Sequence, residues 1–426
     1  MNNVRDYGAV GNGIANDTAA IQRAIDAGGT VNIPDGIYRT GTLRLRSGGG
    51  LELAPGAVLL ASPDPADYLT DPCPQEAGSR IAGGSLAHLI VACEADDVFI
   101  RGGHLDGNGR TFFNGCAFHE RFTGGTQYEQ PVWRPQQLLF FCECTNVRLS
   151  DFSIEDATGW GCFLYGCENV TVRGLRISNS PYISEDDGLD IDCCRFVTVS
   201  DCDIGVGDDA LTLRANPDRL KKPRSCEWVT VSNCLLKSAY AHAIRVGVGN
   251  GIIRHCSVSH CQIRESHCAV HINSKYSDRN GTPDGVEISD VVFHQLHIDT
   301  EMFTSICLDY KFVEKHHCRN AIRNVIFDGI SGRITLPSRI IGNGIGTIEK
   351  IKFRNVDLRA DGICQAAERT RKFLMLDRMD GAFILKQTRG VEFDHVQLDF
   401  EHPEAWGKPL VLSDCPETSV KDGSFS

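Results

Sequence analysis

Residues 186–192 read Asp-Asp-Gly-Leu-Asp-Ile-Asp, and residues 207–210 read Gly-Asp-Asp-Ala. Asp187 lies 21 residues before Asp208 and 22 residues before Asp209. Each acidic stretch leads into a short apolar run of the kind that forms a β-strand. If the chain coils with a period of about two dozen residues, these carboxylates stack on one face of the coil.

Strand-like segments recur along the chain with such a period. Asn146-Val-Arg-Leu, Asn169-Val-Thr-Val and Phe196-Val-Thr-Val follow one pattern, at spacings of 23 and 27 residues. Leucine-rich repeats have a similar period, but their Leu-x-x-Leu-x-Leu pattern is missing here. We therefore expect an all-β solenoid of stacked parallel coils, in which each coil buries its apolar face only against its neighbours.

The first residues differ from the repeats. Residues 1–30 contain a helix start signal at Asn16 or Asp17, and Ile21 and Ile25 then recur four residues apart. We expect a short N-terminal capping helix, ending at Gly28-Gly29, because the open end of a solenoid exposes its core and strand edges.

Residues 1–426 contain no flexible linker, so we expect one domain, which a solenoid permits at this length. Two insertions interrupt the coils. Residues 110–135 are rich in aromatic residues and glycine, which suits a long loop packed beside a site. Residues 215–227 are basic and form either a solvated surface or a wall of a binding cleft.

Composition narrows the possible partners and compartments. The net charge of −12 argues against a nucleic-acid partner, and no apolar run is long enough to span a membrane. The chain has 19 cysteines and no signal-like start, which predicts reduced, buried thiols in a cytoplasmic protein. A secreted or periplasmic chain whose signal had been removed would look the same.

No Cys-x-x-Cys pair is present, so we expect no metal and no cofactor. The oligomeric state stays open.

The stacked carboxylates suit one kind of chemistry. Hydrolysis of a glycosidic bond needs one acid to protonate the leaving oxygen and a second carboxylate to activate water. Asp also caps turns, which is its commonest structural use. Recurrence of the acids at the repeat period favours the catalytic interpretation.

Several motifs resemble family 28 of the glycoside hydrolases, the polygalacturonase family. They include Asp6-Tyr-Gly-Ala, Leu105-Asp-Gly-Asn-Gly, Arg134-Pro135 and Ser180-Pro181, in addition to the two acidic stretches. The resemblance runs from residue 3 to roughly residue 310. It implies a right-handed parallel β-helix and inverting hydrolysis of an α-linked, pectin-type oligosaccharide or polysaccharide.

The family's first acidic motif, Asn-Thr-Asp-Gly, falls on residues 185–188, and its Asp-Asp motif falls on Asp208-Asp209. By this resemblance Asp208 is the general acid, while Asp187 and Asp209 hold and deprotonate the water. Carboxyls one coil apart can reach the separation of roughly 6.5–9.5 Å that inverting enzymes use. The family's Gly-His-Gly motif falls on residues 241–243, where His242 is kept. His242 is expected to orient or tune Asp208 or to bind substrate, and otherwise to be structural.

The family's Arg-Ile-Lys motif, which grips the sugar carboxylate, falls on His271-Ile272-Asn273, where neither basic residue remains. Galacturonate as the substrate sugar is therefore in question. Our candidates for sugar contacts are Arg245, His271, Asn273, Lys275 and Tyr310, and each of them has a surface or stacking role as its alternative. Arg245 and Lys275 would supply the displaced positive charge.

Two other functions remain open. A polysaccharide lyase on the same fold would use Ca²⁺ or a basic residue against a sugar C5 proton. A non-catalytic β-helix would bind glycans without cleaving them. The sequence leaves the sugar, the linkage, and endo or exo action undecided.

Overall fold

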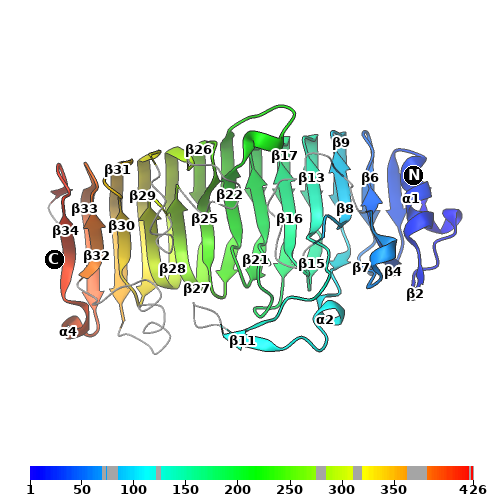
Figure 1. Cartoon of the computed structure of the whole chain (residues 1–426), viewed down its shortest axis with the longest axis horizontal. Coiled ribbons are helices and arrows are strands. Elements are labelled where there is room, and N and C mark those ends of the chain that lie inside the picture. The colour runs from blue at the N-terminus through cyan, green and yellow to red at the C-terminus, as the bar shows by residue number, and fades with distance from the viewer. Residues whose placement is uncertain are drawn as a thin grey trace. The chain divides into compact units, whose positions relative to one another are not determined.

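The computed structural model describes residues 1–69, 73, 85–120, 126–274, 285–309, 319–361, 381–421 and 424–425. Most of them lie in short parallel strands, which confirms the all-β prediction (Figure 1). The chain divides into two compact units. Unit 1 comprises Met1–His119, Thr126–Asp208 and Asp218–Pro223, and unit 2 comprises Glu120–Gly125, Asp209–Pro217 and Arg224–Ser426. The single-domain organisation stays a prediction.

Each regular coil of unit 1 contains three strands. Three successive coils contain β13 (Gln137–Cys142), β14 (Thr145–Ser150) and β15 (Ser153–Glu155), then β16 (Trp160–Tyr165), β17 (Glu168–Arg173) and β18 (Arg176–Ser178), then β19 (Leu189–Asp192), β20 (Arg195–Ser200) and β21 (Asp203–Val206). Corresponding strands pair in parallel from coil to coil. This is the stacking that the repeat period predicts.

The first coils and the loop insertion complete unit 1. Their strands are β1 (Asn2–Asn3), β2 (Asn12–Asn16), β3 (Thr30–Ile33), β4 (Gly36–Thr40), β5 (Leu43–Arg44), β6 (Gly50–Leu53), β7 (Ala57–Ala61), β8 (His88–Cys93), β9 (Asp96–Arg101) and β10 (His104–Asp106). The insertion adds helix α2 (Gly109–Phe112) and the pair β11 (Phe118–Glu120) and β12 (Thr126–Tyr128). Short 3-10 turns cover Val4–Tyr7, Pro65–Asp67 and Pro217–Arg219.

Alternation along each strand decides which face is buried. Val147, Val170 and Val197 stand opposite one another in successive coils, and all three are buried. Their neighbours Arg148 and Thr171 are exposed. Because side chains alternate across a strand, the Val-x-Val pattern forms apolar columns inside the coils. β-branched residues suit such half-buried strands.

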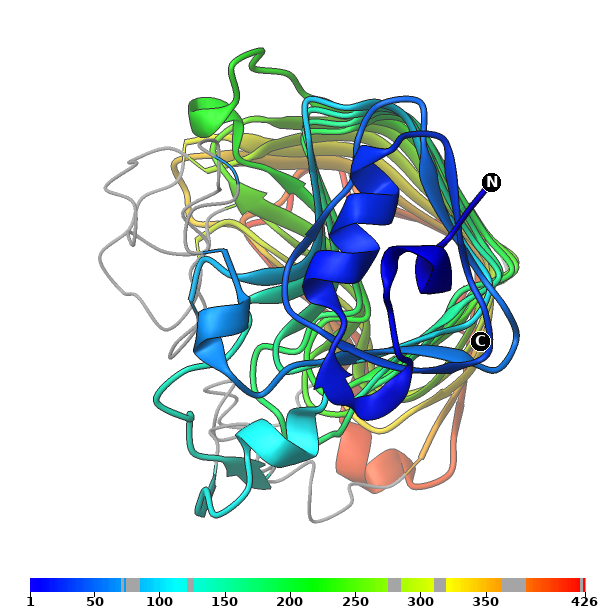
Figure 2. The same cartoon turned by 90° about the vertical axis from the view of Figure 1, so that its right-hand side faces the viewer.

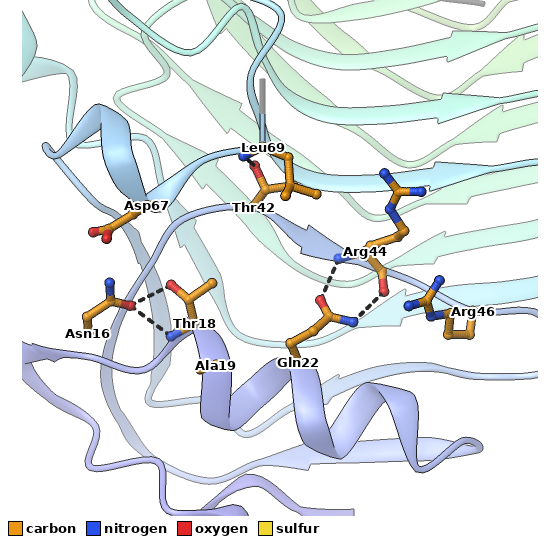
Figure 3. Close-up of a pocket in the computed structure, with 9 residues that line it drawn as sticks. All are labelled: Asn16, Thr18, Ala19, Gln22, Thr42, Arg44, Arg46, Asp67 and Leu69. Carbon is orange, nitrogen blue, oxygen red and sulfur yellow. Dashed lines mark hydrogen bonds between the residues drawn. The ribbon is translucent and has the colours of Figure 1, made fainter. Parts of the chain in front are cut away.

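Helix α1 (Thr18–Asp26) lies across the end of the first coils (Figure 2) and confirms the predicted cap. It buries Ile21 and Ile25, and it ends at Asp26, two residues before the predicted glycines. The carboxylate of Asp17 accepts the N–H groups of residues 10 and 11 and makes no cap bond to the helix. The side chain of Gln22 pins α1 to β5 through bonds of 2.9 and 3.1 Å to the backbone of Arg44 (Figure 3).

Unit 2 is built from longer strands that continue through the bends. They are β22 (Leu211–Ala215), β23 (Cys226–Ser232), β24 (Leu235–Ser238), β25 (His242–Gly249), β26 (Ile252–Ser259), β27 (Gln262–Asn273), β28 (Glu287–Cys307), β29 (Ala321–Ile334), β30 (Ser338–Ile341), β31 (Thr347–Ala360), β32 (Gly381–Lys386), β33 (Glu392–Phe400), β34 (Lys408–Ser413) and β35 (Ser419–Val420), with helix α4 (Pro403–Trp406). Phe293, Phe327, Phe353 and Phe393 stack with ring centroids 4.9–5.1 Å apart. This column extends the coils past residue 310, where the family resemblance in the sequence ends.

None of the 17 cysteines that the structure describes is in a disulfide bond, and most are buried. Burial raises the pKa of the Cys256 and Cys268 thiols to about 12. A thiol with such a pKa stays protonated at neutral pH and reacts slowly. The cysteines therefore serve as small core residues, as the composition predicted. Among the described residues, no helix combines the length and apolarity needed to cross a membrane.

Candidate functional site

Asp187 is positioned by the loop that enters β19. Its backbone carbonyl accepts a 2.7 Å hydrogen bond from the N–H of Gly161, and the next carbonyl, of Gly188, accepts one of 2.9 Å from Cys162. These bonds continue the parallel ladder between β16 and β19, so the position of Asp187 is set by the coil beside it. Its side chain is only 3% exposed.

Asp186 links the two acidic stretches inside unit 1. Its carboxylate oxygens accept hydrogen bonds from the backbone N–H groups of Gly207, at 2.9 Å, and Asp208, at 2.8 Å. Burial raises the pKa of Asp186 well above its ordinary value, while these N–H groups act in the opposite direction. Asp186 therefore holds the loop before β19 against the loop that carries Asp208. Sequence reasoning assigned it no role, although it stood inside the quoted acidic stretch.

The arrangement brings Asp187 and Asp208 together. Oxygen atoms of the two carboxylates lie within 4.8 Å of each other, and the side chain of Asp208 is half-buried. This is closer than the range of roughly 6.5–9.5 Å between carboxyls that we expected for an inverting site.

Asp209 is the residue that follows Asp208, and it is held by two side chains of unit 2. The Nδ1 atom of His242 lies 2.6 Å from Oδ1 of Asp209, and Nη1 of Arg245 donates to Oδ2 at 2.8 Å. Both partners project from β25. The side chain of Asp209 is 1% exposed.

The electrostatics of this group follow from its geometry. Burial by itself would raise the pKa of Asp209, but the charges of Arg245 and His242 outweigh it and hold that pKa well below its usual range. Burial lowers the pKa of His242, and Asp209 opposes that shift. Asp209 is thus a permanent anion at neutral pH, with its charge balanced by a buried guanidinium.

His271 and Asn273 lie on the strand beside β25. His271 stands opposite Arg245, and Asn273 stands opposite Gly247. The ring of His271 stacks on that of His242 with centroids 4.2 Å apart. A Cβ atom at Gly247 would come within 2.1 Å of the Asn273 carbonyl oxygen, so this close approach requires glycine.

The structure thus gathers Asp209, His242, Arg245 and His271 in unit 2, with Asn273 in the same coil as His271. His271 and Asn273 are both buried. Lys275 and Tyr310 lie outside the described residues. The sugar-binding roles assigned to Arg245, His271, Asn273, Lys275 and Tyr310 stay predictions.

The column of residues that contains Arg245 and His271 continues into later coils. Ser305 pairs with His271, and Arg339 pairs with Ser305. Arg339 is 9% exposed, and burial lowers its pKa. Sequence reasoning missed this second buried arginine, which lies past residue 310, where the resemblance to the family ends.

The aromatic insertion packs against the loop that carries Asp187. The N–H of Tyr128 donates to the carbonyl of Tyr182 at 2.8 Å. The fully buried Arg134 donates to the carbonyl of Ser184 at 3.3 Å and forms an ion pair with Glu185 at 3.7 Å. Arg134 therefore holds residues 184 and 185 of the loop that carries Asp187.

Residues 218–223 of the basic insertion belong to unit 1. The N–H groups of Lys221 and Lys222 donate to the carboxylate of Glu143 at 3.1 and 2.8 Å, and the ammonium of Lys221 pairs with Glu94. Lys221 and Glu94 are both exposed. These contacts favour the solvated surface over the cleft wall as the role of these lysines.

Comparison with known proteins agrees with this geometry. The family described as glycosyl hydrolases family 28 matches residues 75–371, and a family described as rhamnogalacturonase A/epimerase, pectate lyase-like, matches residues 1–45. A probable polygalacturonase from Vitis vinifera is 28% identical over 226 residues, which are 50% of this chain and 44% of that protein. An exo-poly-alpha-D-galacturonosidase from Dickeya chrysanthemi is 46% identical over 69 residues, which are 16% of this chain and 12% of that protein. The matches thus span less than half of either relative.

Solved structures share the fold. A family 28 exopolygalacturonase from Yersinia enterocolitica has a TM-score of 0.73 at 18% identity, covering 100% of this chain and 78% of that one. An exopolygalacturonase from Thermotoga maritima has a TM-score of 0.70 at 20% identity, covering 93% of this chain and 91% of that one. The fold is the right-handed parallel β-helix. Because the family match covers more than half of the residues, this chain belongs to glycosyl hydrolases family 28.

Proposed function

We propose that this protein hydrolyses an α-glycosidic bond in a pectin-type oligosaccharide or polysaccharide, with inversion at the anomeric carbon. The observation that carries the proposal is the meeting of Asp187 and Asp208 in unit 1, followed at once in the chain by Asp209. Two carboxyl groups with different protonation states are the minimum that glycoside hydrolysis requires.

The surroundings of each aspartate suggest its role. Asp208 is more exposed than Asp187 and Asp209, so its carboxyl group is the one best placed to meet a leaving oxygen. Asp209 is held as an anion by Arg245 and His242, which suits a group that orients water and accepts its proton. Asp187, next to Asp208, would share the water with Asp209.

The buried ion pair has a consequence for substrate choice. Arg245 is 6% exposed, and its guanidinium binds Asp209. In this arrangement its charge balances Asp209, so a sugar carboxylate would have to compete with that aspartate. Together with the loss of both basic residues at His271 and Asn273, this supports a substrate range that includes neutral sugars as well as galacturonate.

The experiment is a product analysis across pectic and neutral α-linked oligosaccharides. We expect hydrolysis products, with the β-anomer formed first in proton NMR of a fresh digest. The α-anomer appearing first would leave hydrolysis standing and overturn inversion. That outcome is worth testing because the oxygens of Asp187 and Asp208 are closer than the inverting range.

A lyase is the second candidate, since Asp187 and Asp208 are close enough to share a cation. A lyase would release an unsaturated uronate that absorbs in the near ultraviolet, and removal of Ca²⁺ with a chelator would abolish its activity. We expect neither result. Binding without any cleavage across the whole panel would instead support a non-catalytic glycan-binding protein.

A further inference from the structure

A cavity of about 730 Å³ opens in unit 1, beside the loop that leads to Asp187. This volume is typical of small-molecule sites. The walls come from α2 and the turn after it, from β11 and β12, and from the ends of β15 and β18 with the residues that follow them. Helix α2 and strand β11 are labelled in Figure 1. The lining residues include Arg110, Phe113, Phe118, Tyr128, Asp156 and Asn179.

One wall is aromatic and open to solvent. The ring of Phe118 stacks on that of Tyr128 with centroids 4.3 Å apart, and Phe113 lies 5.5 Å from the same tyrosine. Phe118 is 53% exposed. An exposed aromatic ring in a hollow is what the apolar C–H face of a pyranose covers, and covering it removes apolar area from water.

A second wall contains a buried donor. The Oδ1 atom of Asn179 accepts a 3.0 Å hydrogen bond from the N–H of Ala157. This bond fixes the orientation of the amide, so Nδ2 is the atom of this side chain that is left to donate a hydrogen bond. Nδ2 is buried and has no hydrogen-bond partner among the described residues. Buried donors are almost always satisfied, so an acceptor supplied by a ligand is the expected partner.

The charges on the cavity wall select the ligand. Glu155 and Asp156 contribute two carboxylates, and Arg110 contributes one guanidinium. The backbone N–H of Arg110 donates to Asp156 at 2.9 Å, which holds that carboxylate in the wall. The excess of negative charge disfavours a uronate, whereas carboxylates accept hydrogen bonds from neutral sugar hydroxyls.

We propose that this cavity binds a neutral sugar residue of the substrate. The ring lies against Phe118, and one hydroxyl accepts from Nδ2 of Asn179. Ile183 lines the same cavity only four residues before Asp187, so the bound sugar orders the loop that carries the catalytic carboxylate. That the sugar belongs to the substrate rests on the proposed hydrolase function, but the binding itself does not.

The test uses the full-length protein with the substitution Asp208→Asn, so that binding is measured without turnover. Methyl β-D-galactopyranoside, methyl β-D-xylopyranoside and D-galacturonate serve as probes in saturation-transfer NMR. We expect at least one neutral glycoside to bind and galacturonate to bind at least tenfold more weakly. Adding Phe118→Ala should weaken neutral binding at least tenfold. Phe196→Ala is the matched control, because Phe196 is equally exposed, at 51%, and lies outside the cavity.

A second variant tests the polar contact. Asn179→Asp keeps the acceptor for Ala157 and removes the Nδ2 donor, so it should also weaken neutral binding. The proposal is overturned if neither glycoside binds, if galacturonate binds as well as they do, or if binding survives both substitutions. If the Asp208→Asn protein binds a neutral glycoside but the unsubstituted protein hydrolyses no substrate of the panel, the sugar-binding role of the cavity stands and the hydrolase proposal is wrong.

Discussion

His242 and Asp209 are joined by a 2.6 Å contact between Nδ1 and Oδ1, and their side chains are 16% and 1% exposed. The second oxygen of Asp209 accepts from Arg245, so both of its oxygens are engaged from the same strand, β25. This relationship decides how the site should respond to pH.

Removing the guanidinium should change the acid side of the pH profile. Without Arg245 the pKa of Asp209 rises, so the carboxylate protonates at a higher pH as the solution is acidified. We expect the acid limb of kcat/KM for Arg245→Met to move upward by about 1–3 pH units. Arg245→Lys keeps the positive charge, so it should move the acid limb less.

The matched control is Arg254→Met, which breaks the 2.6 Å pair with Glu227 elsewhere in unit 2 and should leave the limb unchanged. Because Arg245→Met leaves a buried carboxylate unpaired, circular dichroism must first show that the variant is folded. A folded Arg245→Met protein with an unshifted limb would contradict the electrostatic role.

The general acid is tested by Asp208→Asn. An amide has nearly the same shape but cannot donate the proton, so kcat should fall by about 10²–10⁴ while fold and substrate binding persist. Asp187→Asn and Asp209→Asn should cost similar amounts by disabling the water. Asp201→Asn, at an exposed bend, is the control. Retention of more than about a tenth of the rate by Asp208→Asn would show that the acid assignment is wrong.

Asp186 should act through position alone. In Asp186→Asn only one oxygen remains to accept the N–H groups of Gly207 and Asp208, so one backbone donor loses its bond. We expect a loss of about 1–3 kcal/mol in the free energy of unfolding. If Asp186 also sets the spacing of the catalytic pair, kcat should fall by about 10–10² with KM nearly constant. Lower stability with an unchanged kcat would reduce Asp186 to a structural residue.

His271→Ala should act mainly on substrate affinity. The position of His271 matches a sugar-gripping residue of the family, and its ring stacks on the ring of His242 with centroids 4.2 Å apart. Steady-state kinetics should therefore show KM rising several-fold, with kcat changed less. A fall in kcat with constant KM would instead mean that the stacked ring supports the His242–Asp209 pair.

The thiols provide a test of compartment. Titration of the denatured, unreduced protein with a thiol reagent should find nearly all 19 cysteines, because none of the 17 described ones is in a disulfide bond. The folded protein should react slowly, since burial raises the pKa of thiols such as Cys256. Several disulfides in protein isolated from its source would point to an oxidising compartment and against the predicted cytoplasmic one.

The local sequence pattern determines much of the fold. The Val-x-Val alternation around residues 147, 170 and 197, repeated at nearly constant spacing, determined parallel coils, because only stacking buries such short apolar faces. The same spacing brought Asp187 and Asp208 into neighbouring coils. Helix α1 could be read from the start signal near Asn16 and the spacing of two isoleucines, within two residues at its end.

Tertiary structure decided what those residues contact. A side chain's partners depend on which residue stands opposite it in the next coil. The register shifts between Leu213 and Ala215, where the insertion of residues 215–227 begins, and the sequence shows the insertion but not the shift. So Arg245 could be chosen as a candidate from sequence, but its bond to Asp209 could not be foreseen. The cavity beside Phe118 arises likewise from loops distant in the chain, whose packing follows from the shape of the coils and not from any repeat.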